Sequence, residues 1–235
     1  MIVFQFDGAY HHWGRLVLQS LRLHEPHTAV LCDTVNLNDR QVEELRAAHP
    51  RVVVINETSK FEKTWPEYMA FRKPFVMQNA MQRYPDQPWY GLFDADFLVR
   101  KPLGPLWSLL DTHPTALVIT DGTWKGKFYR QLVTASGIVL VRRDGKKLID
   151  SWAKWSHHDR RLGSIEPRAW FWDQITLAEA WTEARVPYAV IPMNVYADDQ
   201  LRPTAAIWSA NVPQKKQYYE RFQQEYQRQR AVLSR

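Results

Sequence analysis

Two aspartates separated by one residue, Asp94 and Asp96, are the residues whose type and spacing most clearly suit chemistry. They interrupt an apolar stretch, with Trp89–Phe93 before them and Phe97–Val99 after them. Burying unpaired carboxylates costs free energy, and a bound cation would offset that cost. Mg²⁺ and Mn²⁺ prefer such hard carboxylate oxygens. The pattern favours a divalent-metal site, and the competing interpretation is a solvated acidic turn.

The chain before this pair alternates between short apolar runs and amphipathic segments. Residues 2–6, 28–32 and 51–55 are predicted strands. Residues 10–23 predict a helix, and Asn38 with Gln41 three residues later resembles a capping box that begins a second one. This alternation predicts a parallel sheet with right-handed crossovers. The aspartates follow a fourth strand, at the edge where ligands bind in open parallel sheets.

The rest of the chain continues the α/β pattern. We expect a helix over 67–84 that Pro74 kinks or divides in two, strands at 116–120, 137–141 and 188–191, and a closing helix over 214–232. The loop 121–130, with Gly122, Gly126 and three bases, is a candidate lid. The predicted fold is one α/β domain with a mixed, mostly parallel central sheet flanked by helices.

Composition limits the function classes. With 45% apolar and 24% charged residues in 235, the chain should be globular. A net charge of +6 favours an anionic partner, which is a nucleotide, a nucleic acid or an acidic membrane face. One cysteine, Cys32, suits a reducing compartment, and no apolar run approaches the length that spans a bilayer. These features predict a cytoplasmic protein.

The turn after the first strand has no glycine-rich dinucleotide fingerprint. Asp7-Gly8-Ala9-Tyr10 stands where GxGxxG would follow that strand. This argues against a dinucleotide-binding oxidoreductase, so any nucleotide must be held by other means.

Several segments, taken in order, resemble a known family. The run from Tyr90 to Leu103 resembles the DXD segment of GT-A fold glycosyltransferases, particularly family 8-like enzymes. The first strand with Tyr10 is similar to the nucleotide-binding start of that family. Phe71-Arg72-Lys73-Pro74 matches its basic donor-contacting stretch. Ala135-Ser136-Gly137 resembles its Asn-Ser-Gly strand, with Ala135 replacing Asn, and Trp172-Asp173-Gln174 resembles its Asp-Gln helix start.

The resemblance implies a metal-assisted, retaining glycosyltransferase that uses a nucleotide-diphosphate sugar, UDP-sugar being favoured, with Mn²⁺ or alternatively Mg²⁺. It places the nucleotide-sugar half in 1–115, the acceptor half in 116–213 and a basic helix in 214–235. The implied catalytic residues are Asp173 and Gln174, and the metal ligands are Asp94, Asp96 and Asn211. The implied donor contacts are Asp7, Tyr10, Arg72, Lys73, Asp94, Ala95, Asp96, Ser136, Gly137 and Lys215.

The sequence departs from the family near its end. Family 8 enzymes add a metal ligand from a late His that precedes a Gly and a Lys, whereas Ser209 stands near that place here. The amide oxygen of Asn211 or a water would then be the third ligand. Lys215 is still expected to contact the diphosphate.

Simpler interpretations stand beside these roles. Asp173 also suits a helix N-cap, and Arg72, Lys73 and Lys215 also suit ordinary surface charges. The last 22 residues hold six bases and two acids, which favours either packing on the domain or contact with an anionic membrane. The acceptor is a glycan, a glycolipid or a nucleic acid such as DNA.

Two other function classes compete. A haloacid dehalogenase-like phosphatase also carries a DxD at a strand end and a later acidic pair such as Asp198-Asp199, but that fold places its DxD on the first strand, and three strands precede it here. A basic nucleic-acid-binding module is the non-enzymatic alternative, although the bases are scattered along the chain.

Overall fold

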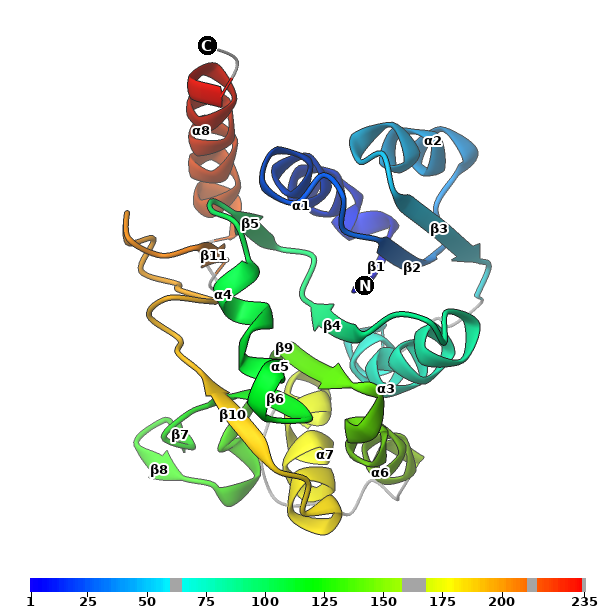
Figure 1. The fold of residues 1–235 in the computed structure, drawn as a ribbon, viewed down its shortest axis with the longest axis vertical. Coiled ribbons are helices and arrows are strands. Elements are labelled where there is room, and N and C mark those ends of the chain that lie inside the picture. Colours follow the sequence, from blue (N-terminus) through cyan, green and yellow to red (C-terminus); the bar gives the residue numbers. More distant parts are fainter. Residues whose placement is uncertain (60–64, 158–167, 211–214, 234–235) are drawn as a thin grey trace. The chain divides into compact units, whose positions relative to one another are not determined.

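The computed structural model describes residues 1–59, 65–157, 168–210 and 215–233 (Figure 1). The chain forms two compact units. The terminal unit contains residues 2–58, 93–107 and 192–235, and the middle unit contains Met1 with 59–92 and 108–191. The main sheet has the strand order β10-β6-β9-β4-β1-β2-β3. This mixed sheet with its helices confirms the predicted α/β class, whereas the single-domain assignment stays a prediction.

The beginning of the terminal unit follows the predicted alternation. Its strands β1 (Ile2–Asp7), β2 (Val30–Val35) and β3 (Val52–Glu57) pair in parallel. A 3₁₀ turn over Gly8–Tyr10 leads from β1 into α1 (His11–His24). The apolar side chains of β1 are buried because both faces of a parallel sheet are covered.

The capping box that the sequence predicts is present at the start of α2 (Asp39–Ala48). Asn38 Oδ1 accepts a hydrogen bond from the Gln41 amide at 2.9 Å, and Gln41 Oε1 accepts one from the Asn38 amide at 3.0 Å. The two side chains thus satisfy two backbone donors that the first turn of a helix leaves without partners. Figure 1 shows α2 beside α1, and the two helices are in contact.

Two short strands after the acidic pair were not predicted. β4 (Trp89–Phe93) ends at the aspartates, and β5 (Phe97–Val99) pairs antiparallel with β11 (Ile207–Ser209). The Ala210 amide extends this pairing by donating to the Asp96 carbonyl at 3.1 Å. Strands of three residues are too short for an alternating pattern to be detected in the sequence.

The closing helix α8 (Lys215–Leu233) packs on the terminal unit, as the packing interpretation predicts. Phe222 and Tyr226 are buried in one cluster with Trp13, Leu16 and Leu98. Burial of two large aromatic side chains contributes about 2 kcal/mol each to the docking of this helix. Within the described ranges, no helix has the length and apolar character needed to cross a bilayer.

A buried arginine directly after β5 connects three parts of the terminal unit. Arg100 Nη2 lies 2.9 Å from Glu225 Oε1 on α8, and its guanidinium carbon lies 4.0 Å from the centre of the Trp208 ring on β11. Arg100 Nη1 also donates to the carbonyls of residues in the loop before β11, at 3.2, 3.0 and 2.9 Å for Arg202, Pro203 and Ala205. The planar fork of arginine suits several simultaneous acceptors.

The middle unit contains β6 (Thr115–Ile119), which pairs antiparallel with β9 (Thr134–Arg142) and parallel with β10 (Tyr188–Ile191). Its longer helices pack on one another and are α3 (Trp65–Arg83), α6 (Lys146–His157) and α7 (Arg168–Ala184). Pro74 lies inside α3, which is one helix rather than two. The short helices are α4 (Gly104–Trp107), in the terminal unit, and α5 (Leu109–Thr112).

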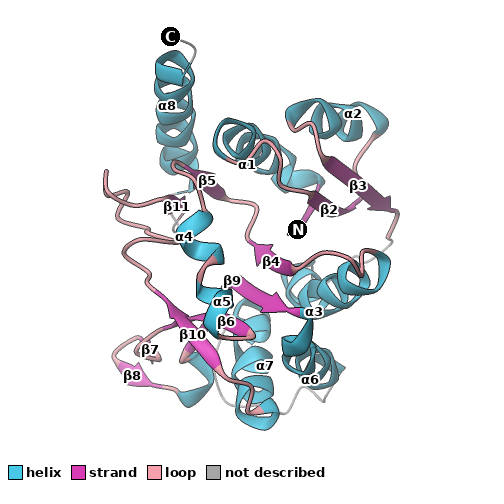
Figure 2. Cartoon of the chain, viewed as in Figure 1, coloured by secondary structure: helices cyan, strands magenta, loops and turns pink. Residues whose placement is uncertain are grey.

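The candidate lid is a β-hairpin of β7 (Thr123–Trp124) and β8 (Lys127–Phe128), visible in Figure 2 as two short strands of the middle unit. Lys125 and Gly126 form its two-residue turn with φ of 48° and 73°. Positive φ at both central positions is the requirement of a type I′ turn, whose twist matches the flanking strands.

The ion pairs of Glu225 predict an acid-sensitive attachment of α8. Burial raises the pKa of Glu225, but hydrogen bonds from Arg228, Gln229 and Arg100 outweigh it and lower the pKa to about 2. The stabilisation is therefore complete above the ordinary pKa near 4.5 and is lost as the pH falls towards about 2. Glu225→Gln should lower the free energy of unfolding at pH 7 by about 2 kcal/mol, allowing for screening of the exposed Arg228.

Urea unfolding of both proteins between pH 7 and pH 2.5 measures this difference, which should shrink below pH 4.5. Glu220→Gln, an exposed glutamate on the same helix, is the matched control and should change little. A difference between wild type and Glu225→Gln that stays constant with pH would contradict the assignment.

Candidate functional site

The predicted site residues form two clusters, one in each unit. The terminal-unit cluster is built on the turn Asp94-Ala95-Asp96 between β4 and β5. Asp94 and Asp96 are partly exposed, whereas Ala95 is buried at 5% exposure. The small side chain between the acids thus faces the interior while both carboxylates are accessible. The role of the two acids at this turn stays a prediction.

Lys215, the first residue of α8, reaches this turn. Its Nζ lies 2.7 Å from Asp96 Oδ2 and donates to the Tyr10 hydroxyl at 2.5 Å. The same ammonium lies 4.5 Å from the centre of the Tyr10 ring, within the range of a cation–π contact. Burial alone lowers the pKa of Lys215, but the Asp96 carboxylate and the Tyr10 hydroxyl outweigh burial and raise it overall. Lys215 therefore carries its positive charge at neutral pH.

Asp7 holds the turn that presents Tyr10. It is the N-cap of the 3₁₀ turn after β1, and its Oδ1 accepts the Tyr10 amide at 3.1 Å. Asp7 is buried at 7% exposure, whereas Tyr10 is partly exposed. The carboxylate thus fixes the backbone of the residue whose ring meets Lys215. Sequence order alone places Asp7 at the end of β1, and the structure adds this positioning role.

The middle-unit cluster joins three elements around one buried carboxylate. Lys73 Nζ on α3 lies 2.6 Å from Asp173 Oδ2 on α7, and the Ser136 hydroxyl on β9 donates to the same oxygen at 2.7 Å. Lys73 also donates to Ser136 Oγ at 3.3 Å. The amide of Gln174 donates to Asp173 Oδ1 at 2.9 Å. Both carboxylate oxygens are therefore satisfied, and the aspartate is held in one orientation.

The simpler interpretation of Asp173 as a helix N-cap is wrong. The helix α7 begins at Arg168, so Asp173 lies inside it rather than at its start. Asp173 is buried at 6% exposure and forms an ion pair with Lys73. Lys73 is therefore not an ordinary surface charge. The N-cap interpretation rested on residue type alone, because Asp is common at helix N-caps.

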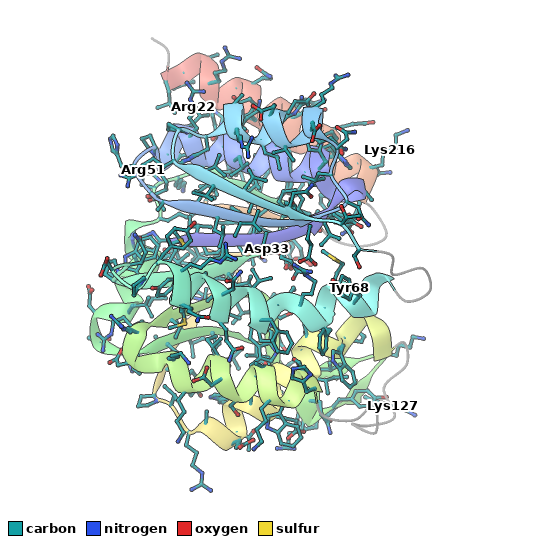
Figure 3. All side chains as sticks on the ribbon, turned by 90° about the vertical axis from the view of Figure 1, so that its right-hand side faces the viewer. Arg22, Asp33, Arg51, Tyr68, Lys127 and Lys216 are labelled. Atoms are coloured by element: carbon teal, nitrogen blue, oxygen red, sulfur yellow. The ribbon has the colours of Figure 1, made fainter. Side chains whose placement is uncertain are left out.

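The other predicted residues have less defined surroundings. Arg72 Nη1 donates to the Tyr68 hydroxyl at 2.9 Å, one helical turn earlier on α3, and Figure 3 labels Tyr68. Gly137 and Gln174 are partly exposed. Their donor contacts stay predictions, as do those of Arg72. Asn211, the predicted third metal ligand, lies outside the described residues.

The donor set of the acidic turn suits a hard divalent cation. Among the described residues, no group of three or more His, Cys, Asp or Glu side chains is placed to hold a metal ion. Mg²⁺ sites commonly use only one or two protein carboxylates and complete their coordination with substrate phosphates and water. The two accessible aspartates fit that kind of site. Lys215 is then a competitor for Asp96, because one carboxylate oxygen already accepts its ammonium.

Sequence reasoning missed the residue that aligns the terminal-unit cluster. Arg100 follows β5 directly, four residues after Asp96, and it contacts α8, whose first residue is Lys215. The signal was a single base after an apolar run, which is also typical of a strand end at the surface. Its burial depends on residues more than one hundred positions later.

The fold defines the class of structure to which the chain is similar. Solved glycosyltransferases of the GT-A type share the fold over nearly the whole chain. No protein-family model matches the sequence. No curated protein matches it significantly either.

One of these solved structures is the glycosyltransferase GlyE of Streptococcus pneumoniae TIGR4, which is 16% identical to this chain and superposes with a TM-score of 0.63. The match covers 99% of this chain and 62% of GlyE. This chain thus spans about six tenths of the length of GlyE. A glycosyltransferase involved in glycosylation of the major capsid of PBCV-1 matches at 13% identity and a TM-score of 0.57, covering 95% of this chain and 98% of that chain.

The galactosyltransferase LgtC, solved in complex with donor and acceptor sugar analogs, matches at 16% identity and a TM-score of 0.52. The match covers 97% of this chain and 95% of LgtC. At such identities the likeness establishes the fold.

The buried ion pair predicts a large effect of removing its cation. Lys73→Met leaves the Asp173 carboxylate buried without its counter-ion, which should lower the free energy of unfolding by about 3 kcal/mol. Lys73→Met combined with Asp173→Asn should recover much of that loss, because the remaining group is neutral. Denaturant unfolding measures both.

The control is Lys146→Met, which removes an exposed ion pair of similar length with Asp150 and should cost less than about 0.5 kcal/mol. Equal effects of Lys73→Met and Lys146→Met would show that the Lys73–Asp173 pair is not a buried one in solution.

Proposed function

We propose that this protein is a glycosyltransferase that moves a sugar from a nucleotide-diphosphate donor to an acceptor with the help of a divalent cation. The observation that carries the proposal is the contact of Lys215 with Asp96 and Tyr10, on a turn that follows β4 in a GT-A fold. Carboxylates, a cation and an aromatic ring are the groups needed to hold a metal-bound diphosphate and a flat base.

The proposal assigns the diphosphate end of the donor to the terminal-unit cluster. Lys215 Nζ carries a positive charge that a leaving phosphate attracts, and the exposed part of the Tyr10 ring offers a stacking face to a base. Asp94 and Asp96 would hold Mn²⁺, or alternatively Mg²⁺, and such an ion neutralises charge on the departing diphosphate when it is bound. Asp7 keeps Tyr10 in place through its amide.

The proposal assigns the transferred sugar to the middle-unit cluster. Asp173 carries negative charge that can stabilise an oxocarbenium-like transition state, and Lys73 and Ser136 fix its orientation. A carboxylate that accepts three hydrogen bonds suits electrostatic stabilisation better than nucleophilic attack, because three of its roughly four lone-pair positions are already engaged. Gln174, the next residue, is proposed to border the same centre. Retention of the anomeric configuration belongs to the proposal.

The finer assignments follow from the family resemblance and from the solved structures of similar fold. LgtC was solved with donor and acceptor sugar analogs, which supports a sugar donor and a sugar acceptor for this fold. We favour a UDP-sugar, either hexosyl or pentosyl, as the donor. The acceptor is a glycan, a glycolipid or DNA, and contact of α8 with an anionic membrane would serve the second of these. A cytoplasmic location stays a prediction.

Asp96 is the residue whose loss should be most damaging. Asp96→Asn keeps the size of the side chain but removes the charge that holds the cation, so turnover should fall at least about a hundredfold. The donor is first selected by thermal shift among UDP-, GDP-, ADP- and CMP-sugars with Mn²⁺. Nucleotide release from that donor is then measured, with circular dichroism as the check on folding.

Asp86→Asn is the matched control, because Asp86 is an exposed aspartate in the turn before β4 and should leave turnover unchanged. Wild-type turnover in a folded Asp96→Asn protein would refute the role of the acidic turn.

Lys215 should affect metal and nucleotide binding in opposite directions. Lys215→Met removes the ammonium that competes for Asp96, so Mn²⁺ alone should bind several-fold more tightly. The same change removes a phosphate contact, so UDP in the presence of Mn²⁺ should bind about tenfold more weakly. Isothermal titration measures both affinities without any need for the acceptor.

Lys216→Met serves as the control because Lys216, labelled in Figure 3, is the exposed neighbour on the same helix. If Lys215→Met changed the Mn²⁺ and UDP affinities in the same direction, the proposed competition would be wrong.

A further inference from the structure

Helix α7 carries a fully buried threonine almost one turn after Asp173. Thr176 is 0% exposed. Threonine is disfavoured inside a helix, because its branched side chain loses rotamer freedom and its hydroxyl competes for backbone groups. Valine has the same branched shape and brings no polar atom into the interior. The Thr176 hydroxyl therefore needs a reason that packing alone does not supply.

The hydroxyl of Thr176 uses its full hydrogen-bonding capacity. Thr176 Oγ1 donates to the Trp172 carbonyl at 2.8 Å, and the Asp173 carbonyl lies 3.3 Å away as a longer, second acceptor. The same oxygen accepts the indole Nε1–H of Trp152 at 3.0 Å and the Ser156 hydroxyl at 3.4 Å. A hydroxyl has one donor and two acceptor positions, so all of them are occupied.

The two donors to this hydroxyl come from the neighbouring helix α6. Trp152 and Ser156 lie one turn apart on α6, and both are buried. Figure 1 shows α6 beside α7, and the two helices are in contact. The Trp152 indole is a donor only, so it directs the proton of the Thr176 hydroxyl away from α6 and towards the α7 backbone. A buried polar network with all its members satisfied is rigid.

Asp173 is thereby fixed at its backbone as well as at its carboxylate. Its carboxylate contacts Lys73 Nζ at 2.6 Å and accepts the Ser136 hydroxyl at 2.7 Å. Its carbonyl and the one before it are the acceptors of Thr176. Threonine hydroxyls that bond to carbonyls of the preceding turn often bend a helix. The backbone at 172–173 sets the direction of the Asp173 side chain, so its contacts also set where the carboxylate lies.

We infer that Thr176, held by Trp152, is a positioning residue for Asp173, whose hydroxyl fixes the backbone from which the carboxylate reaches Lys73 and Ser136. The inference rests on the proposed glycosyltransferase function, in which Asp173 stabilises the transition state. Thr176 and Trp152 are both fully buried, so they act on turnover through Asp173 and not through contact with a substrate.

The first measurement follows the ion pair and needs no substrate. The Lys73 ammonium is mostly buried and contacts two oxygen atoms, so its hydrogens should exchange slowly with water. Its signal in nitrogen–proton NMR spectra is identified by its loss in Lys73→Met. Thr176→Val keeps the shape of the side chain and removes the hydroxyl, so the exchange at Lys73 should become about tenfold faster.

The second measurement is nucleotide release from the donor selected by thermal shift. Because Asp173 is proposed to act in the transition state, Thr176→Val should lower kcat about tenfold and leave KM for the donor unchanged. Thr176→Ser keeps the hydroxyl and should retain the wild-type kcat, although the lost methyl group lowers stability. A merely structural role would lower the stability of both variants without this difference in kcat.

Thr182→Val is the matched control. Thr182 lies further along α7 and makes the same kind of backbone contact, donating to the Ala178 carbonyl at 2.9 Å. This variant should leave the exchange at Lys73 and kcat unchanged. Trp152→Phe is the second test variant, because it keeps a large ring and removes the indole donor. It should change both quantities in the same direction as Thr176→Val, and it replaces that variant if Thr176→Val does not fold.

The inference is overturned if the folded test variant keeps the wild-type exchange at Lys73, or if it keeps the wild-type kcat. If wild type releases nucleotide from no donor and Thr176→Val still speeds the exchange, the proposed function fails while the positioning of the ion pair stands. If wild type is active and the test variant matches it in both measurements, the inference fails while the proposed function stands.

Discussion

The contact between Arg100 and Glu225 is the interaction on which the terminal unit depends. Arg100 follows the strand that carries the chain away from the acidic turn, and Glu225 lies in the middle of α8. A guanidinium at this depth is tolerated because a carboxylate, three carbonyls and the Trp208 ring surround it. The position of Lys215 at the start of α8 follows from this attachment.

Each of the two clusters contains an ion pair between a lysine and an aspartate, although the proposed chemistry of the clusters differs. In each, a lysine side chain contacts one oxygen of an aspartate, at 2.7 Å for Lys215 with Asp96 and 2.6 Å for Lys73 with Asp173. The first pair lies at a partly exposed turn, so a ligand can exchange with it. The second is mostly buried and has a serine as a further donor, so the Asp173 carboxylate is held in one orientation.

Local signals in the sequence predicted the parts that depend on neighbouring residues. Asn38 and Gln41 marked the start of α2, and the apolar run before Asp94 placed the acids at the end of β4. Parts that depend on distant residues were not predicted. β5 and β11 are too short to show a period, and α7 already includes Arg168, so the Asp at position 173 does not mark its start.

The sequence predicted which residues belong to the candidate site, but it did not predict which of them contact one another. The pairing of Lys73 with Asp173 and of Lys215 with Asp96 joins positions 100 and 119 residues apart, and no spacing rule in a single sequence reveals such pairs. Family resemblance identified these residues without their contacts. The structure shows that each lysine is paired with one of the predicted acids.

The pairing of β5 with β11 has a consequence for how the chain is made. Val99 has no strand partner until Ile207 has been synthesised, so the edge of β5 stays open while the intervening residues are made. The acidic turn consequently cannot reach its final form on the ribosome while this late segment is still inside the exit tunnel. A nascent chain therefore holds the Asp94 and Asp96 carboxylates in an unfinished turn until residues 207–209 have left the ribosome.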